Sequence, residues 1–173
     1  GRNRVVAFVI LSSINSEHQF WMFQHLKSWW PVGVKSPIIF MDGDIAAERS
    51  LSVAWPSAVI LKCRWHIAQN LFAAFSRMPD FTDFIDAFHE LAFSMTEELY
   101  SNRFQEIRRA FPFAVDKMDA LNAKKHEWAS FATSRHFTCG ATTTSRSESS
   151  NHQVCQFLSI YFYILIQSKY HLY

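Results

Sequence analysis

The sequence predicts an α/β protein with an all-helical insertion in its second half. Three short apolar runs alternate with longer segments that carry apolar side chains at helical spacing, an order typical of a sheet covered by helices. From residue 79 onward only the helical spacing continues. The 173 residues include 4 Gly and 5 Pro, which favours helices over a turn-rich all-β fold. With 49% apolar and 18% charged residues, the chain can bury a core of its own.

The predicted strands are about 4–11, 37–42 and 58–62, with helices at 17–30, 45–55 and 63–78 between and after them. The first strand is apolar throughout, which is typical of a strand buried on both faces. Ser16 and Gln19 have the spacing of a capping box at the start of the first helix. Residues 1–78 are therefore predicted to form one α/β unit.

The second half is predicted to be a helical insertion and loop, residues 79–140. Its helices are expected at about 81–92, with Asp80 as N-cap, at 96–110 and at 115–128. The polar stretch 131–145 reads as a loop. A closing helix is predicted within 141–166, followed by a tail at 167–173.

Charge and cysteine content say little about function by themselves. A net charge of +2 does not indicate nucleic-acid binding, and the chain has no long Lys/Arg run of the kind that directs nuclear import. Three cysteines fit a reducing compartment better than a disulfide framework. The most apolar run, 154–166, is too short to predict a membrane span, so we expect no membrane association.

Asp42 and Asp44 follow the second strand directly. Carboxylates at strand ends of an α/β sheet face the crevice where ligands bind, and oxygen ligands suit Mg²⁺. The alternative is a turn in which Asp44 caps the next helix, and for Asp44 this is the preferred interpretation. Glu148 is a third candidate, although Ser145-x-x-Glu148 is also a capping-box pattern.

Cys63-x-x-His66 has the spacing of half a zinc site. Cys139, Cys155, His136 and His152 are the residues that would complete it, but the second half lacks a matching motif, and we expect no structural zinc. A helix that starts here would instead direct backbone N–H groups at an anion. Basic and aromatic residues nearby could contact phosphates and bases, or simply be solvated on a helix surface; they are Lys62, Arg64, Trp65 and Arg146.

Three segments together resemble the Mutator-like (MULE) transposases. Ile38-Ile39-Phe40-Met41-Asp42-Gly43-Asp44-Ile45-Ala46 is similar to that family's I-x-T-D-x-D-x-A segment, and Trp55-Pro56-Ser57-Ala58 to the F-P-x-A that follows. Cys63-Arg64-Trp65-His66-Ile67-x-x-Asn70 resembles its C-x-W-H-I-x-x-N box. Thr143-Thr144-Ser145-Arg146-Ser147-Glu148-Ser149-x-Asn151 resembles its T-T-x-R-S-E-S-x-N box. The order and spacing of these segments agree over about residues 5–151.

The resemblance implies a ribonuclease-H-like core of the DDE transposase superfamily, with a helical insertion before its last acidic residue. Asp42 matches the second catalytic aspartate and Glu148 the catalytic glutamate, and both would bind Mg²⁺ or Mn²⁺. Cys63 and His66 match the motif near the site, and Asn151 joins the residues that could contact DNA. The implied chemistry is metal-dependent DNA strand cleavage and strand transfer. The implied partners are transposon terminal repeats and target DNA, bound by a homo-oligomer in the nucleus.

The sequence also departs from the family pattern. The family's first catalytic aspartate lies on a strand upstream of the segment that matches residues 4–11, and Met41 replaces the usual Thr. We therefore expect an N-terminally truncated fragment without its first core strands, inactive as given. One alternative is a domesticated, transposase-derived DNA-binding or transcription-regulator module without catalysis. Another is a zinc domain unrelated to transposition.

Overall fold

The short β-strands of this protein are hydrogen-bonded in parallel. In the computed structural model, which describes residues 15–136, β1 (Ile38–Met41) pairs with β2 (Val59–Lys62). The register runs from Ile38 opposite Val59 to Met41 opposite Lys62. Beyond the strand ends, the Cys63 N–H donates to the Met41 carbonyl at 2.8 Å. The described residues all belong to one compact unit, Val9–Thr143.

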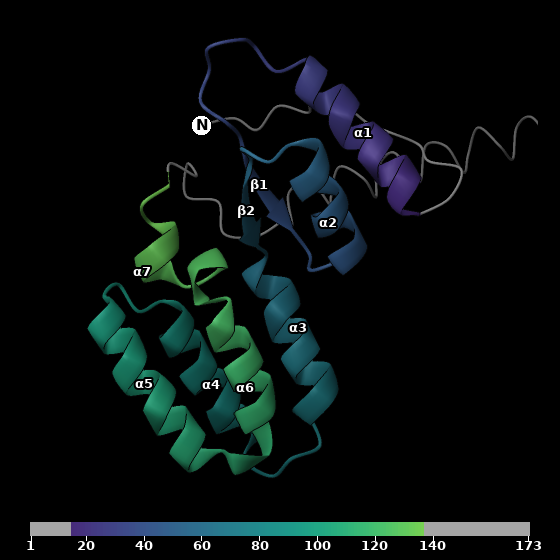
Figure 1. Ribbon diagram of the computed structural model, residues 1–173. Helices are drawn as coiled ribbons and strands as arrows, with labels where there is room; N and C mark the ends of the chain where they lie inside the picture. Colours follow the sequence, from purple (N-terminus) through teal and green to yellow (C-terminus); the bar gives the residue numbers. More distant parts are fainter. Residues whose placement is uncertain (1–14, 137–173) are drawn as a thin grey trace, which may run out of the picture. The chain divides into compact units, whose positions relative to one another are not determined.

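Two helices pack against each other beside this sheet (Figure 1). They are α1 (Ser16–Ser28) and α2 (Ile45–Ala54), and α2 makes the connection from β1 to β2 that parallel pairing requires. A small core joins them to the sheet; its buried members are Phe23, Met41, Leu51, Ala54 and Trp55. Lys27 of α1 donates to the Ala54 carbonyl at 3.1 Å, which satisfies one end of α2.

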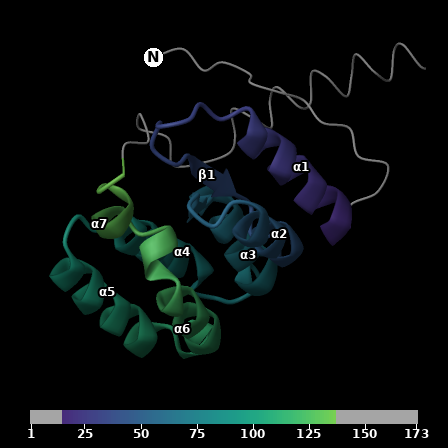
Figure 2. The same ribbon diagram turned by 45° about the horizontal axis from the view of Figure 1, so that its top comes forward.

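The remaining helices share a second, larger core. The helices are α3 (Arg64–Phe75), α4 (Phe81–Ala92), α5 (Glu97–Ala110), α6 (Val115–Ala123) and the short α7 (Ser130–Thr133). Figure 2 shows α4, α5 and α6 grouped next to α3. Aromatic rings fill much of the space between them; Trp128, for example, stacks on Phe88 with ring centroids 5.6 Å apart. Fully buried aliphatic residues such as Leu71 and Leu91 complete this core.

The predicted strands 37–42 and 58–62 are confirmed to within a residue or two at each end, as are the helices at 17–30, 45–55, 81–92 and 96–110. The helix predicted at 63–78 is also present, but it ends three residues earlier, at Phe75. The fold of residues 15–136 is therefore mixed α/β and mostly helical. Among these residues no helix is both long enough and apolar enough to cross a membrane. The predicted strand 4–11, the closing helix within 141–166 and the tail 167–173 lie outside the described residues.

Three local predictions were wrong. Asn15 rather than Ser16 caps α1, because its side chain accepts from the His18 N–H at 2.8 Å. The helix predicted at 115–128 ends at Ala123, and a 3₁₀ turn, Lys125–Glu127, follows it. The predicted loop from 131 begins inside α7, whose residues are all buried. There, Phe131 and Ala132 pack into the larger core, and this tertiary contact forms a helical turn at the start of a stretch that is otherwise polar in sequence.

We predict that Leu91→Ala destabilises the protein by about 2–5 kcal/mol, because Leu91 is 0% exposed in the larger core and its removal leaves a cavity. Leu99→Ala is the matched control, since Leu99 is 41% exposed on α5. Urea unfolding of both variants provides the measurement. Equal losses of unfolding free energy would contradict the assignment of Leu91 to the core.

Candidate functional site

The acidic turn after β1 gives its two aspartates different roles. Asp44 is the N-cap of α2, and its side chain accepts from the backbone N–H groups of Ala46 at 2.8 Å and Ala47 at 3.2 Å. The expectation that Asp44 acts as a cap is therefore confirmed. Asp42 is exposed at the strand end, where its carboxylate accepts from the Asp44 N–H at 3.2 Å. Gly43 between them has φ +105°, a conformation that residues with a side chain rarely adopt.

The Cys-x-x-His segment starts beside this turn. Because β1 and β2 are parallel and in register, Asp42 and Cys63 both follow their strands at the same edge of the sheet. Cys63 is buried at the N-cap position of α3, and His66 lies half-buried in the first turn of that helix. The His66 ring meets the Trp65 ring edge-on, with centroids 4.7 Å apart. The fold thus places these two sequence motifs next to each other.

A cavity of about 320 Å³ lies at this edge of the sheet. The strand ends contribute Asp42 and Lys62, and helix α3 contributes Ile67, Asn70 and Leu71. Residues of and just after α6 form the opposite wall; they are Lys117, Ala120, Leu121, Lys124 and Trp128. Most of the wall is apolar, while its charged groups comprise one carboxylate and three ammonium groups.

Lys62 is held by carboxylates of the protein itself. Its side chain is only 11% exposed and forms an ion pair with Glu48 of α2, which is 14% exposed. Glu127 lies 3.9 Å from the same ammonium group, and Lys124 lies 3.9 Å from the second Glu48 oxygen. Burial, and after it the ammonium of Lys124, lowers the pKa of Lys62, while Glu127 and Asp42 oppose this shift. Lys62 is therefore a neutralised charge at the back of the cavity.

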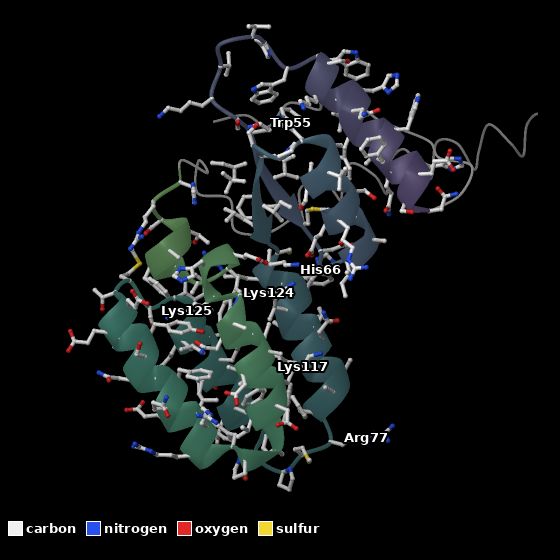
Figure 3. The ribbon with its side chains drawn as sticks, viewed as in Figure 1. Trp55, His66, Arg77, Lys117, Lys124 and Lys125 are labelled. Carbon is white, nitrogen blue, oxygen red and sulfur yellow. The ribbon has the colours of Figure 1, made fainter. Side chains whose placement is uncertain are left out.

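Lys117 and Lys124 carry the positive charge that the cavity offers to a ligand. Both lie on the side of α6 that faces α3, whereas Lys125 lies on the other side (Figure 3). Lys125 is paired with Glu97 at 2.8 Å. Lys117 makes no ion pair or hydrogen bond with any other residue in the range 15–136, and Lys124 is exposed. These two ammonium groups are therefore accessible to an anion.

Arg64 is used inside the protein. Its guanidinium donates to the Ser130 hydroxyl at 2.9 Å and lies 4.8 Å from the centre of the Phe93 ring. Burial lowers the pKa of Arg64, as expected for a cation enclosed by protein. This role connects α3 to α7 and competes with the predicted DNA contact. Trp65, in contrast, is exposed on α3.

The described residues do not form a complete metal site. No group of three or more His, Cys, Asp or Glu side chains within residues 15–136 is arranged to bind an ion. Asp42 is the one acidic side chain that lines the described cavity wall. Glu148, Arg146 and Asn151 lie outside the described residues, as do Cys139, Cys155 and His152. A divalent ion at Asp42 would need a further ligand such as Glu148.

Sequence reasoning missed four residues of this region, namely Glu48, Asn70, Lys117 and Lys124. The sequence does contain a signal for Lys117 and Lys124. Together with Leu121 they follow helical spacing, so they must share one face of α6. Glu48 carries no such signal, since its partner Lys62 lies on the next strand.

No protein-family model matches the chain, and no curated protein or solved structure matches it either.

We predict that Glu48→Gln destabilises the protein by about 1–3 kcal/mol, because it leaves the largely buried ammonium of Lys62 without its nearest counter-charge. Asp119→Asn is the matched control; it breaks an ion pair with Arg108 in which both side chains are more than a third exposed, and should cost less than about 1 kcal/mol. Chemical unfolding distinguishes the two, and a similar cost for both variants would refute the role assigned to Glu48.

The pKa of Lys62 also predicts a pH dependence. A lowered pKa means that, between its value in the folded protein and its ordinary value of 10.5, the unfolded chain binds more protons than the folded chain. The contribution of Lys62 to the unfolding free energy therefore rises with pH in that window. We expect the wild-type protein to gain stability relative to Lys62→Met as the pH rises toward 10.5. A difference that stays constant or falls, measured by urea unfolding, would contradict this.

Proposed function

We propose that this chain is a catalytic-domain segment of a Mutator-like DNA transposase, with a ribonuclease-H-like core that is interrupted by a helical insertion. The parallel register of β1 and β2 carries the proposal. It brings Asp42 and the Cys63-x-x-His66 segment to one edge of a sheet, where the α/β arrangement favours ligand binding. In this proposal the helices α4, α5 and α6, which follow the two strands in the chain, form the insertion.

The charges around Asp42 suit a phosphodiester substrate. Lys117 and Lys124 present ammonium groups beside the strand end, and such groups neutralise backbone phosphates. In this proposal Asp42 and Glu148 share a Mg²⁺ or Mn²⁺ ion, while the lysines hold the DNA strand. DNA is thus the proposed partner, and the family's nuclear, oligomeric assembly on transposon ends is proposed by resemblance alone.

We expect no strand cleavage by this chain alone. The motifs that match the family supply two carboxylates, Asp42 and Glu148, whereas the family's site uses three. With two ligands an ion can still bind, but with lower affinity and without the fixed geometry that in-line displacement needs.

A DNA-binding module without chemistry is the second candidate. The observation that favours it is that two accessible ammonium groups, Lys117 and Lys124, line the cavity with a single carboxylate, Asp42, while Lys62 is neutralised by Glu48. This balance favours an anion more than a cation. In this reading the fold and the phosphate contacts remain while metal binding is lost.

Mn²⁺ binding distinguishes the two candidates. For the transposase segment we expect weak Mn²⁺ binding, measured by electron paramagnetic resonance of the free ion, that falls at least fivefold in Asp42→Asn and in Glu148→Gln. Asp44→Asn is the matched control, because asparagine is as good an N-cap as aspartate and α2 keeps its start.

Equal affinities of wild type and Asp42→Asn for Mn²⁺ would overturn the metal site and leave the DNA-binding module. A plasmid-nicking assay with Mg²⁺ or Mn²⁺ tests the expected inactivity. Strong nicking that disappears in Asp42→Asn would show that this expectation is wrong.

A further inference from the structure

The cavity beside Asp42 has two chemically different surfaces. One is an apolar wall, whose accessible side chains are Ile45, Ala120 and Leu121. Leu71 and Trp128 lie behind this wall, with 0% and 1% of their surface exposed. The indole N–H of Trp128 donates to the Leu121 carbonyl at 3.0 Å, and this bond connects the wall to the buried ring behind it. A wall of this kind favours a flat, weakly polar group over a metal ion or a small anion.

The second surface consists of the two accessible lysines. Lys117 and Lys124 lie two turns apart on α6, about 10 Å along the helix axis, and Leu121 lies between them. They therefore flank the apolar wall from both ends. A ligand that fills the space between them would meet one ammonium group at each end.

The remaining polar group is the side-chain amide of Asn70. It lines the cavity from α3 and makes no hydrogen bond with other residues in the described part of the chain. An amide offers both a donor and an acceptor in one plane, which matches the polar edge of a nucleic-acid base.

The cavity volume of about 320 Å³ is at the lower end of the range for small-molecule sites. It accommodates one ring system with its sugar rather than a base pair.

We propose that this cavity binds a single unstacked nucleotide that belongs to a DNA strand, with its base against the accessible apolar side chains Ile45, Ala120 and Leu121. Lys117 and Lys124 then contact the phosphates on the two sides of that nucleotide, and Asn70 contacts the base edge. Strand binding is favoured over free nucleotides, because a nucleotide within a strand carries phosphate on both sides. This inference rests on the proposed function only for DNA as the source of the nucleotide.

Thymidine 3′,5′-bisphosphate is the probe, compared by calorimetry with thymidine 5′-monophosphate and inorganic phosphate. We expect the bisphosphate to bind about tenfold more tightly than the monophosphate, and inorganic phosphate most weakly, because each lost charge-assisted contact weakens binding. Saturation-transfer NMR should show contact with the base protons. A single-stranded oligothymidylate should bind at least as tightly as the bisphosphate.

Variants of α6 test each surface separately. Lys117→Ala and Lys124→Ala should each weaken bisphosphate binding about tenfold, whereas Arg77→Ala, which removes a distant exposed charge (Figure 3), should leave it unchanged. Ala120→Phe should block the cavity, and Ala123→Phe is its control, since Ala123 is exposed on the same helix but does not line the cavity. Unfolding curves verify that each variant folds.

Two results would overturn the inference. One is the absence of bisphosphate binding by the wild-type chain. The other is inorganic phosphate binding as tightly as the bisphosphate with no effect of Ala120→Phe, which would show an anion site without a base pocket. If nucleotide binding fails while Mn²⁺ binding at Asp42 remains, the inference falls and the proposed function stands. If nucleotide binding succeeds without Mn²⁺ binding, the inference stands and the DNA-binding module is favoured.

Discussion

The parallel pairing of β1 and β2 is the constraint on which the rest of the site depends. Each strand has only four residues, and a two-stranded sheet of this length is not stable by itself. Its position is fixed by helices on both sides of the sequence: α1 and α2 bury Met41, and α3 continues directly from β2. This packing therefore keeps the two strand ends side by side, so that Asp42, Lys62 and Cys63 lie at the same edge of the sheet.

The charge network behind the cavity connects the neighbouring elements α2 and β2 with the end of α6, which is far from them in sequence. Glu48 of α2 pairs with Lys62 of β2 and lies 3.9 Å from Lys124 at the end of α6. Removing such charges from water costs free energy, and the geometry of the pairs only partly offsets that cost. The main effect of the network is to hold the end of α6, with Lys124, in a fixed position relative to α2 and β2, and so relative to the acidic turn that precedes α2.

Much of the local structure could be predicted from the sequence, and little of the cavity. Short apolar runs located the described strands, and helical spacing with Pro or Gly stops located most of the helices. Asp44 could be recognised as a cap because capping is a local interaction. The pairing of Lys62 with Glu48 and the contact of Arg64 with Ser130 join residues that only the tertiary fold brings together. The helical spacing of Lys117 and Lys124 is a sequence signal that they share a face of α6, but it does not indicate which helix that face meets.

Substitutions of Gly43 and of Asp42 have different consequences for the acidic turn. A side chain there would meet no atom within 4 Å, so the positive φ alone restricts this position to glycine. A substitution of Gly43 would turn the backbone on which both carboxylates depend, and α2 would lose its cap along with the candidate ligand. Replacing Asp42, in contrast, leaves the turn and the helix start in place. The candidate ligand can therefore be changed without changing the fold, whereas a change of the turn at Gly43 affects both.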